Sequence, residues 1–156
     1  MMKPYHGNVS KWFRNYILFL VADVDDSILW KKTEFANSPG WTLMHLIVEG
    51  ELALKKLVPE YECRIGTVKD FEFGSDGTAN SGLAKQEMTD MFISVYSELD
   101  EAVAGSIDLL YSKPNTDELL KDELSLELDF YLHMLTTHIA MHCDALTKWR
   151  KMQGIG

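Results

Sequence analysis

The segment from residue 59 to 82 most constrains the fold, because it is a long connection between two stretches of helical periodicity. It begins at Pro59, holds four glycines and includes the turn sequence Gly74-Ser-Asp-Gly77. About ten extended residues already span a helix bundle about 30 Å long. This link has 24 residues and can therefore cross the molecule from end to end. We expect the helices before and after it to run parallel.

Four stretches have apolar residues spaced three and four apart, which is typical of helices with one buried face. We expect a helix from Asn8 or Ser10 to about Lys32, two more over about residues 39–58 and 81–111, and a last one that includes residues 128–149. Ser38 can cap the second helix, and Pro39 has the backbone angle of a first helical position. Residues 117–124 either join the last helix or form a short helix of their own.

These elements predict an all-α protein with one domain over residues 1–156. Short links after the first and third helices imply antiparallel neighbours at those two places. With the long crossover between the second and third helices, the expected architecture is a four-helix bundle in the order up-down-down-up.

The composition narrows the classes of partner. The chain is 46% hydrophobic and 25% charged, as in ordinary globular domains. Its net charge of −9 argues against nucleic acid, because phosphate contacts need a basic face. No signal-peptide cleavage site follows the N-terminal apolar run, and no run approaches the roughly 18 residues of a transmembrane helix. Cys63 and Cys143 do not form a disulfide or CxxC pattern. We expect a cytoplasmic protein that binds no membrane.

The stretch 128–149 places two histidines where apolar residues would be expected. Its apolar positions form one helix face: Leu128, Tyr131, Leu132, Leu135, Ile139, Leu146 and Trp149. His138 and His142 fall on that face, about one turn apart, and two imidazoles so placed can bind one metal ion. The alternative is a pair of core histidines, each hydrogen-bonded to a neighbour. His133 is about 140° from His138 around a continuous helix, which predicts that it faces the opposite side.

A third histidine, His45, lies on the apolar face of the second helix with Trp41 and Val48. The predicted topology brings it to the same end of the bundle as the C-terminal half of the last helix. Three histidine ligands leave open positions on a divalent ion, which is typical of catalytic rather than structural sites. We expect zinc or nickel first, with iron or manganese as alternatives. Glu49, one turn after His45, is either a further ligand or base, or a solvated carboxylate.

Two of these stretches resemble the DinB/YfiT-like family of metal-dependent enzymes. They are SPGWTLMHL at the start of the second helix and THIAMHCDAL with its H-x-x-x-H spacing, and a long link with an FGSDG-like turn agrees. The resemblance implies a four-helix bundle of the order above, with one divalent metal on three histidines that match His45, His138 and His142. Trp41 matches the aromatic residue one turn before the first ligand.

The resemblance also bears on the reaction. Relatives include transferases and isomerases that use low-molecular-weight thiols, so a small-molecule substrate is implied, and a thiol is one candidate. Many members carry a glycine and then a glutamine after the last histidine, where this chain has Asp144 and Ala145. A role for that glutamine therefore does not carry over.

Other metal enzymes are excluded by their own motifs. HIAMH has Ile139 where a zinc protease of the H-E-x-x-H type needs its glutamate, and no histidine has a glutamate three residues before it, as di-iron bundles require. Two interpretations remain. One is a metal-dependent enzyme, a thiol-dependent S-transferase or a small-molecule hydrolase, whose catalytic residues the sequence does not name. The other is a non-catalytic binding or dimerisation module with a vestigial or structural metal. We also expect a homodimer, since small bundles often pair through exposed helix faces.

Overall fold

The structure is a computed structural model that describes residues 6–155. This part of the chain forms helices and no strand, with one isolated antiparallel bridge between Pro114 and Leu126. The predicted all-α class is confirmed. The helices are α1 (His6–Ala22), α2 (Pro39–Leu57), α3 (Val68–Phe71), α4 (Lys85–Ser112), α5 (Glu127–Leu135) and α6 (Thr137–Met152). None of these helices combines the length and apolar character that crossing a membrane requires.

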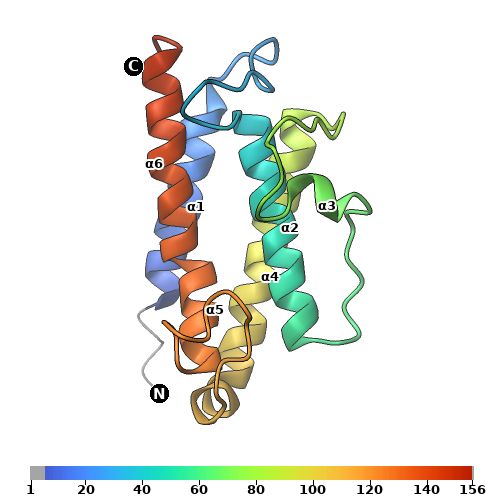
Figure 1. Ribbon diagram of the computed structural model, residues 1–156, viewed down its shortest axis with the longest axis vertical. Helices are drawn as coiled ribbons and strands as arrows, with labels where there is room; N and C mark the ends of the chain where they lie inside the picture. The colour runs from blue at the N-terminus through green and yellow to red at the C-terminus, as the bar shows by residue number, and fades with distance from the viewer. Residues whose placement is uncertain (1–5, 156) are drawn as a thin grey trace.

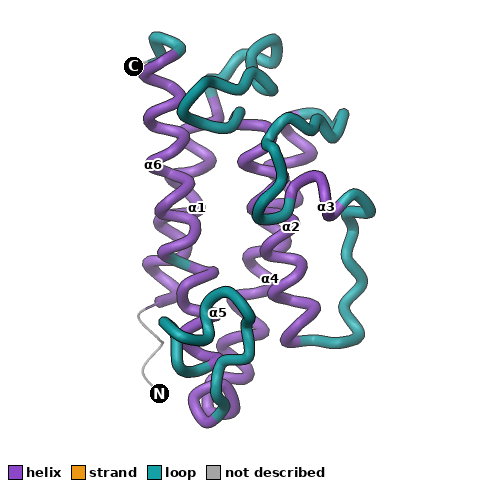
Figure 2. The backbone as a smooth tube through the Cα atoms, viewed as in Figure 1, coloured by secondary structure: helices purple, strands orange, loops and turns teal. Residues whose placement is uncertain are grey.

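The long helices lie along one common direction (Figure 1). α1 runs upward in that view, α2 and α4 both run downward, and α5 continues into α6 upward to the C-terminus. The link from α2 to α4 returns along the outside of α2 and carries the short helix α3 (Figure 2). α2 packs mainly against α4, and α1 packs mainly against α6.

The beginning of α2 follows the expected capping pattern. The Ser38 hydroxyl accepts a hydrogen bond from the Trp41 backbone N–H at 3.2 Å, and Pro39 is the first helical residue. Residues 38–48 are all buried, so the first half of α2 is a core element on every side. His45 lies in the middle of this segment.

The first and third helices have different limits from those we predicted. α1 begins at His6 and ends at Ala22 rather than near Lys32, because residues 26–30 form turns. There the Asp25 carboxylate accepts a hydrogen bond from the Ser27 backbone N–H at 2.8 Å, which competes with helical pairing. α4 begins at Lys85, not at residue 81. At this end of the helix the Glu87 carboxylate accepts a hydrogen bond from the backbone N–H of Ala84.

The predicted last helix is two helices. α5 ends at Leu135 and α6 begins at Thr137, with Thr136 between them at φ −131° and ψ −76°. The Thr136 hydroxyl donates a 2.6 Å hydrogen bond to the Leu132 carbonyl, a local bond that Ser and Thr often make where helices bend. Residues 117–124 join neither helix, and they fold into turns between α4 and α5.

Candidate metal centre

Three histidines from α2 and α6 direct their Nε2 atoms to one point. Nε2 of His138 lies 3.3 Å from Nε2 of His45 and 3.2 Å from Nε2 of His142. Around a tetrahedral zinc ion with bonds of about 2.0–2.1 Å, two nitrogen ligands are about 3.3 Å apart. Among residues 6–155, these three are the only group of His, Cys, Asp or Glu close enough to share one ion. The sequence predicted this set, and the structure brings it together.

Hydrogen bonding alone does not satisfy the three rings. His138 Nδ1 is buried and has no partner in the described part of the chain. A neutral His138 either leaves this nitrogen as a bare acceptor or places its only proton there, facing nothing. In the second state the Nε2 lone pairs of His138 and His45 face each other over 3.3 Å, because the Nδ1 proton of His45 points to the Phe71 carbonyl. This arrangement is unfavourable unless a donor or a cation lies between them. The donor set therefore fits a divalent ion.

His45 is held by backbone groups of the α2–α4 link. Its Nδ1 lies 2.6 Å from the carbonyl oxygen of Phe71, the last residue of α3. Its ring stacks on Trp41, with the ring centres 4.9 Å apart and the planes 9° from parallel. The indole N–H of Trp41 in turn donates to the Asp70 carbonyl at 3.2 Å. These contacts fix both the tautomer and the orientation of the His45 ring.

Glu49 lies on the other side of the His45 ring from the shared point. Its Oε1 is 3.9 Å from His45 Nδ1 and accepts a hydrogen bond from the Phe73 backbone N–H at 2.9 Å. It does not belong to the group of three ligands. Its observed contacts are those of a residue that anchors the link to α2.

All three ligand histidines are neutral at neutral pH. Burial, together with repulsion from the neighbouring imidazoles of His142, His45 and His133, lowers the pKa of His138 to about 2. Burial and the His45 ring lower the pKa of His142 to about 3. Burial also lowers the pKa of His45, against the opposing effects of the Phe71 carbonyl and Glu49. A neutral imidazole is the form that binds a metal.

The prediction that His133 faces the opposite side from His138 is wrong. Its ring centre lies 6.0 Å from that of His138, and both rings line one pocket. The prediction assumed an unbroken helix, whereas the break at Thr136 changes the helical phase between the two histidines. Burial lowers the pKa of His133 as well. It remains outside the group whose nitrogens converge.

Cys143, the residue after His142 in the sequence, faces away from the histidines. Its thiol lies 3.9 Å from the Phe13 carbonyl, on the side of α6 that packs on α1. Burial raises the pKa of this thiol to about 11. It is a packed core residue.

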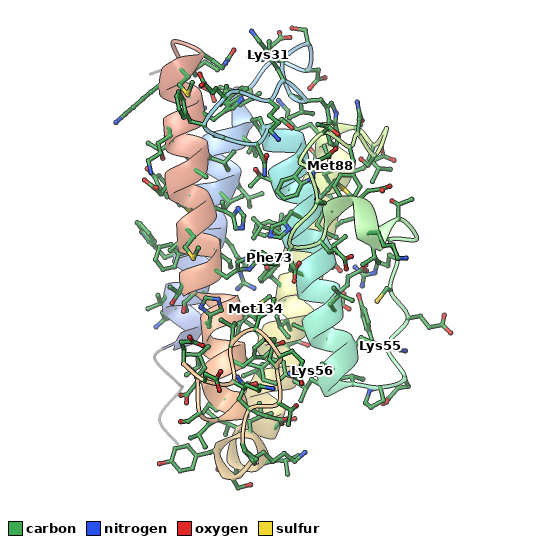
Figure 3. All side chains as sticks on the ribbon, in the orientation of Figure 1. Lys31, Lys55, Lys56, Phe73, Met88 and Met134 are labelled. Carbon is green, nitrogen blue, oxygen red and sulfur yellow. The ribbon has the colours of Figure 1, made fainter. Side chains whose placement is uncertain are left out.

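The histidines open into a pocket of about 790 Å³ between α2 and the α5–α6 pair. Phe73, Met134 and Lys56 succeed one another down this space (Figure 3). Its volume is within the range of small-molecule sites, about 300–1,000 Å³. One wall is a face of α2. Sequence patterns did not reveal the other walls, because these come from the link, from the turns before α5 and from the face of α5 that the break at Thr136 turns toward the pocket.

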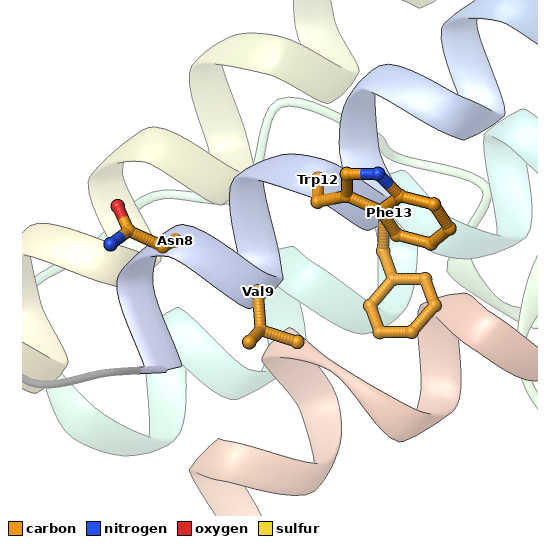
Figure 4. A pocket seen from close by; sticks show the side chains of 4 residues that line it. All are labelled: Asn8, Val9, Trp12 and Phe13. Carbon is orange, nitrogen blue, oxygen red and sulfur yellow. The ribbon is translucent and has the colours of Figure 1, made fainter.

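A second hollow, of about 320 Å³, lies on the outer side of α1. Asn8, Val9, Trp12 and Phe13 line it (Figure 4). It contains no ionisable side chain and offers no catalytic chemistry.

Comparisons with protein-family models, curated proteins and solved structures found no match to this chain. The functional argument therefore rests on the geometry of the histidine site and its pocket.

Proposed function

We propose that this protein is a divalent-metal-dependent enzyme related to the DinB/YfiT-like family, with His45, His138 and His142 as the metal ligands. The observation that carries the proposal is the approach of three Nε2 atoms, 3.2 and 3.3 Å apart, at the wall of a large pocket. Zinc or nickel is the first choice of ion, because neutral imidazoles suit both, with iron or manganese as alternatives.

The reaction is a thiol-dependent S-transfer or the hydrolysis of a small molecule. A divalent ion bound by three histidines supplies a Lewis acid with open coordination positions, and it would favour the deprotonated form of a thiol or water. The chain holds the ligands neutral, fixes the His45 ring through Phe71 and Trp41, and presents a largely apolar pocket beside them. The open pocket favours an enzyme over a module with a vestigial or structural metal.

Metal analysis with a matched activity assay tests this proposal. Protein purified without a histidine tag should contain close to one equivalent of ion per chain, and the His138→Ala variant should contain almost none. The loaded protein should accelerate the reaction of a low-molecular-weight thiol with a chromogenic electrophile, or hydrolyse a chromogenic ester. A wild-type chain that binds no divalent ion after loading and dialysis would contradict the proposal.

We also propose the finer points of the architecture and assembly: an up-down-down-up four-helix bundle in one domain, located in the cytoplasm as a homodimer.

A row of stacked aromatic side chains on α1 supports the dimer. Tyr16 stacks between Trp12 and Phe19, at 5.5 and 6.2 Å between ring centres. Trp12 is 59% exposed and Phe19 is 68% exposed, so this row offers a second copy an apolar face. Analytical ultracentrifugation tests the dimer: the wild type should sediment as a dimer and the Trp12→Glu variant as a monomer. A monomeric wild type would contradict the proposal.

A further inference from the structure

The pocket beside the histidines is elongated along α2. The α2 residues that line it follow one face of the helix from its first turn to its last: Trp41, His45, Glu49, Leu52, Ala53 and Lys56. His45 and Lys56 are eleven residues apart, which is about 16 Å along a helix axis. The metal ligands therefore occupy one end of a long space, and Lys56 stands near the other.

Between these two ends the walls are mostly apolar. The side chains opposite α2 are Phe130 and Met134 of α5 and Met141 of α6, and Leu119 and Leu120 contribute from the preceding turns. Phe73 lies over the pocket although it is 74% exposed. A ligand with an apolar body would cover these side chains and remove them from water.

The far end carries a single cation. Among the described residues that line the pocket, Lys56 is the only Lys or Arg. Its Nζ lies 4.3 Å from the centre of the Phe130 ring and 3.8 Å from Oδ2 of Asp117. The separation from Asp117 is at the outer limit of an ion pair, and both side chains are about a quarter exposed. A loosely paired ammonium group of this kind can accept an anionic group from a ligand.

We propose that the pocket binds an elongated amphipathic small molecule whose anionic group, a carboxylate, pairs with Lys56. Its apolar body lies along α2 between Leu52 and Met134, and its opposite end reaches the three histidines. The claim that the ligand reacts at the histidine end rests on the proposed function above. The claim that the pocket binds the apolar body and the carboxylate is independent of it, because neither contact involves the metal.

Binding to the metal-free protein tests the proposal, since a carboxylate then has no ion to bind in place of Lys56. The probes are straight-chain alkanoates from hexanoate to dodecanoate, titrated by calorimetry below their micelle concentrations. Each added methylene should tighten binding by about fourfold, as expected for burial of apolar surface, until the tail reaches the histidines. Dodecan-1-ol, which has the same body without the charge, should bind at least about tenfold more weakly than dodecanoate.

Lys55 provides the matched control. It is the neighbour of Lys56, but its Nζ donates to the Tyr61 carbonyl at 2.7 Å and it does not line the pocket. Lys56→Met should weaken dodecanoate binding at least about tenfold and leave dodecan-1-ol binding nearly unchanged, whereas Lys55→Met should change neither. Lys56→Arg should retain most of the affinity.

Equal losses in the two methionine variants, or an affinity independent of chain length, would overturn the proposal. The outcome is separable from that of the metal experiment. A chain that binds dodecanoate through Lys56 but binds no metal would disprove the enzyme and keep this pocket. A chain that binds metal but no alkanoate would disprove the proposed ligand of this pocket and keep the metal site.

Discussion

Nδ1 of His45 donates a hydrogen bond to the backbone carbonyl of Phe71 over 2.6 Å. A carbonyl can only accept, so the proton of the neutral ring is on Nδ1. The lone pair of Nε2 therefore points away from the link, toward the place where the Nε2 atoms of His138 and His142 also lie. The carbonyl of a four-residue helix inside a link thus sets the tautomer of a residue on another helix.

The link is bonded to three successive turns of α2. The Trp41 indole N–H donates to the Asp70 carbonyl, His45 donates to Phe71, and Glu49 accepts from the Phe73 backbone N–H. The long connection therefore has two roles. Its length allows α2 and α4 to run in the same direction, and its middle section orients the candidate ligand His45.

The contacts of Glu49 lead to a first prediction. Glu49→Gln keeps an oxygen that can accept from the Phe73 N–H, so zinc affinity should change less than about threefold. Glu49→Ala removes this anchor and should weaken zinc binding by roughly tenfold, as loss of groups that support metal ligands commonly does. Competition with a chromogenic chelator measures both affinities. If Glu49→Gln lost zinc as completely as His45→Ala, Glu49 would be a ligand.

A second prediction separates the histidines of the pocket. His133→Ala should retain the full zinc content, because His133 lies beside the three converging nitrogens without joining them. His138→Ala and His142→Ala should each lose most of the zinc. Elemental analysis after loading and dialysis gives the number of ions per chain. Equal losses in all three variants would mean that His133 moves into the metal shell.

Local signals explain what the sequence could predict. The apolar spacing, the Ser38-Pro39 start and the four-residue spacing of His138 and His142 each act within one helix, so they predicted the helical class and this histidine pair. His45 was added from its place on the apolar face of the second helix, from the expected topology and from the family resemblance. The break at Thr136 depends on whether the Leu132 carbonyl accepts its hydrogen bond from the Thr136 hydroxyl or from a backbone amide of a continuous helix. Packing decides between the two, and the sequence pattern does not show it. The sequence also could not predict that the Phe71 carbonyl holds the His45 ring, because every residue has a backbone carbonyl and none is marked by its side chain.

A third prediction concerns the packing at the start of α2. A Cβ atom on Gly40 would lie 2.7 Å from the Trp30 ring, whereas one on Gly105 would meet nothing within 4 Å. Gly40→Ala should therefore reduce the free energy of unfolding by about 1–3 kcal/mol through overpacking. Gly105→Ala, in the middle of α4, should increase it by about 0.5–1 kcal/mol because alanine favours helix. Urea denaturation measures both, and a Gly40→Ala chain as stable as the wild type would contradict the close approach.

The last prediction follows from the lowered pKa values of the buried histidines. His138 and His142 stay neutral in the folded protein down to about pH 2 and 3, while unfolded histidines take up protons below about pH 6.5. As the pH falls below about 6.5, the unfolded state gains protons that the folded state does not, so stability must fall. Each of these two histidines should cost the metal-free protein about 1 kcal/mol for each pH unit below that value.

Denaturation of the metal-free protein at several pH values between about 7 and 5 measures this slope. Carboxylates also titrate toward the lower end of that range, so the informative quantity is the difference between variants. His142→Gln removes one of the titrating groups and should reduce the pH dependence by about 1 kcal/mol per unit. Identical slopes for the wild type and His142→Gln would show that His142 is accessible to protons in the folded state. The three imidazoles would then not form the neutral cluster from which the metal site is inferred.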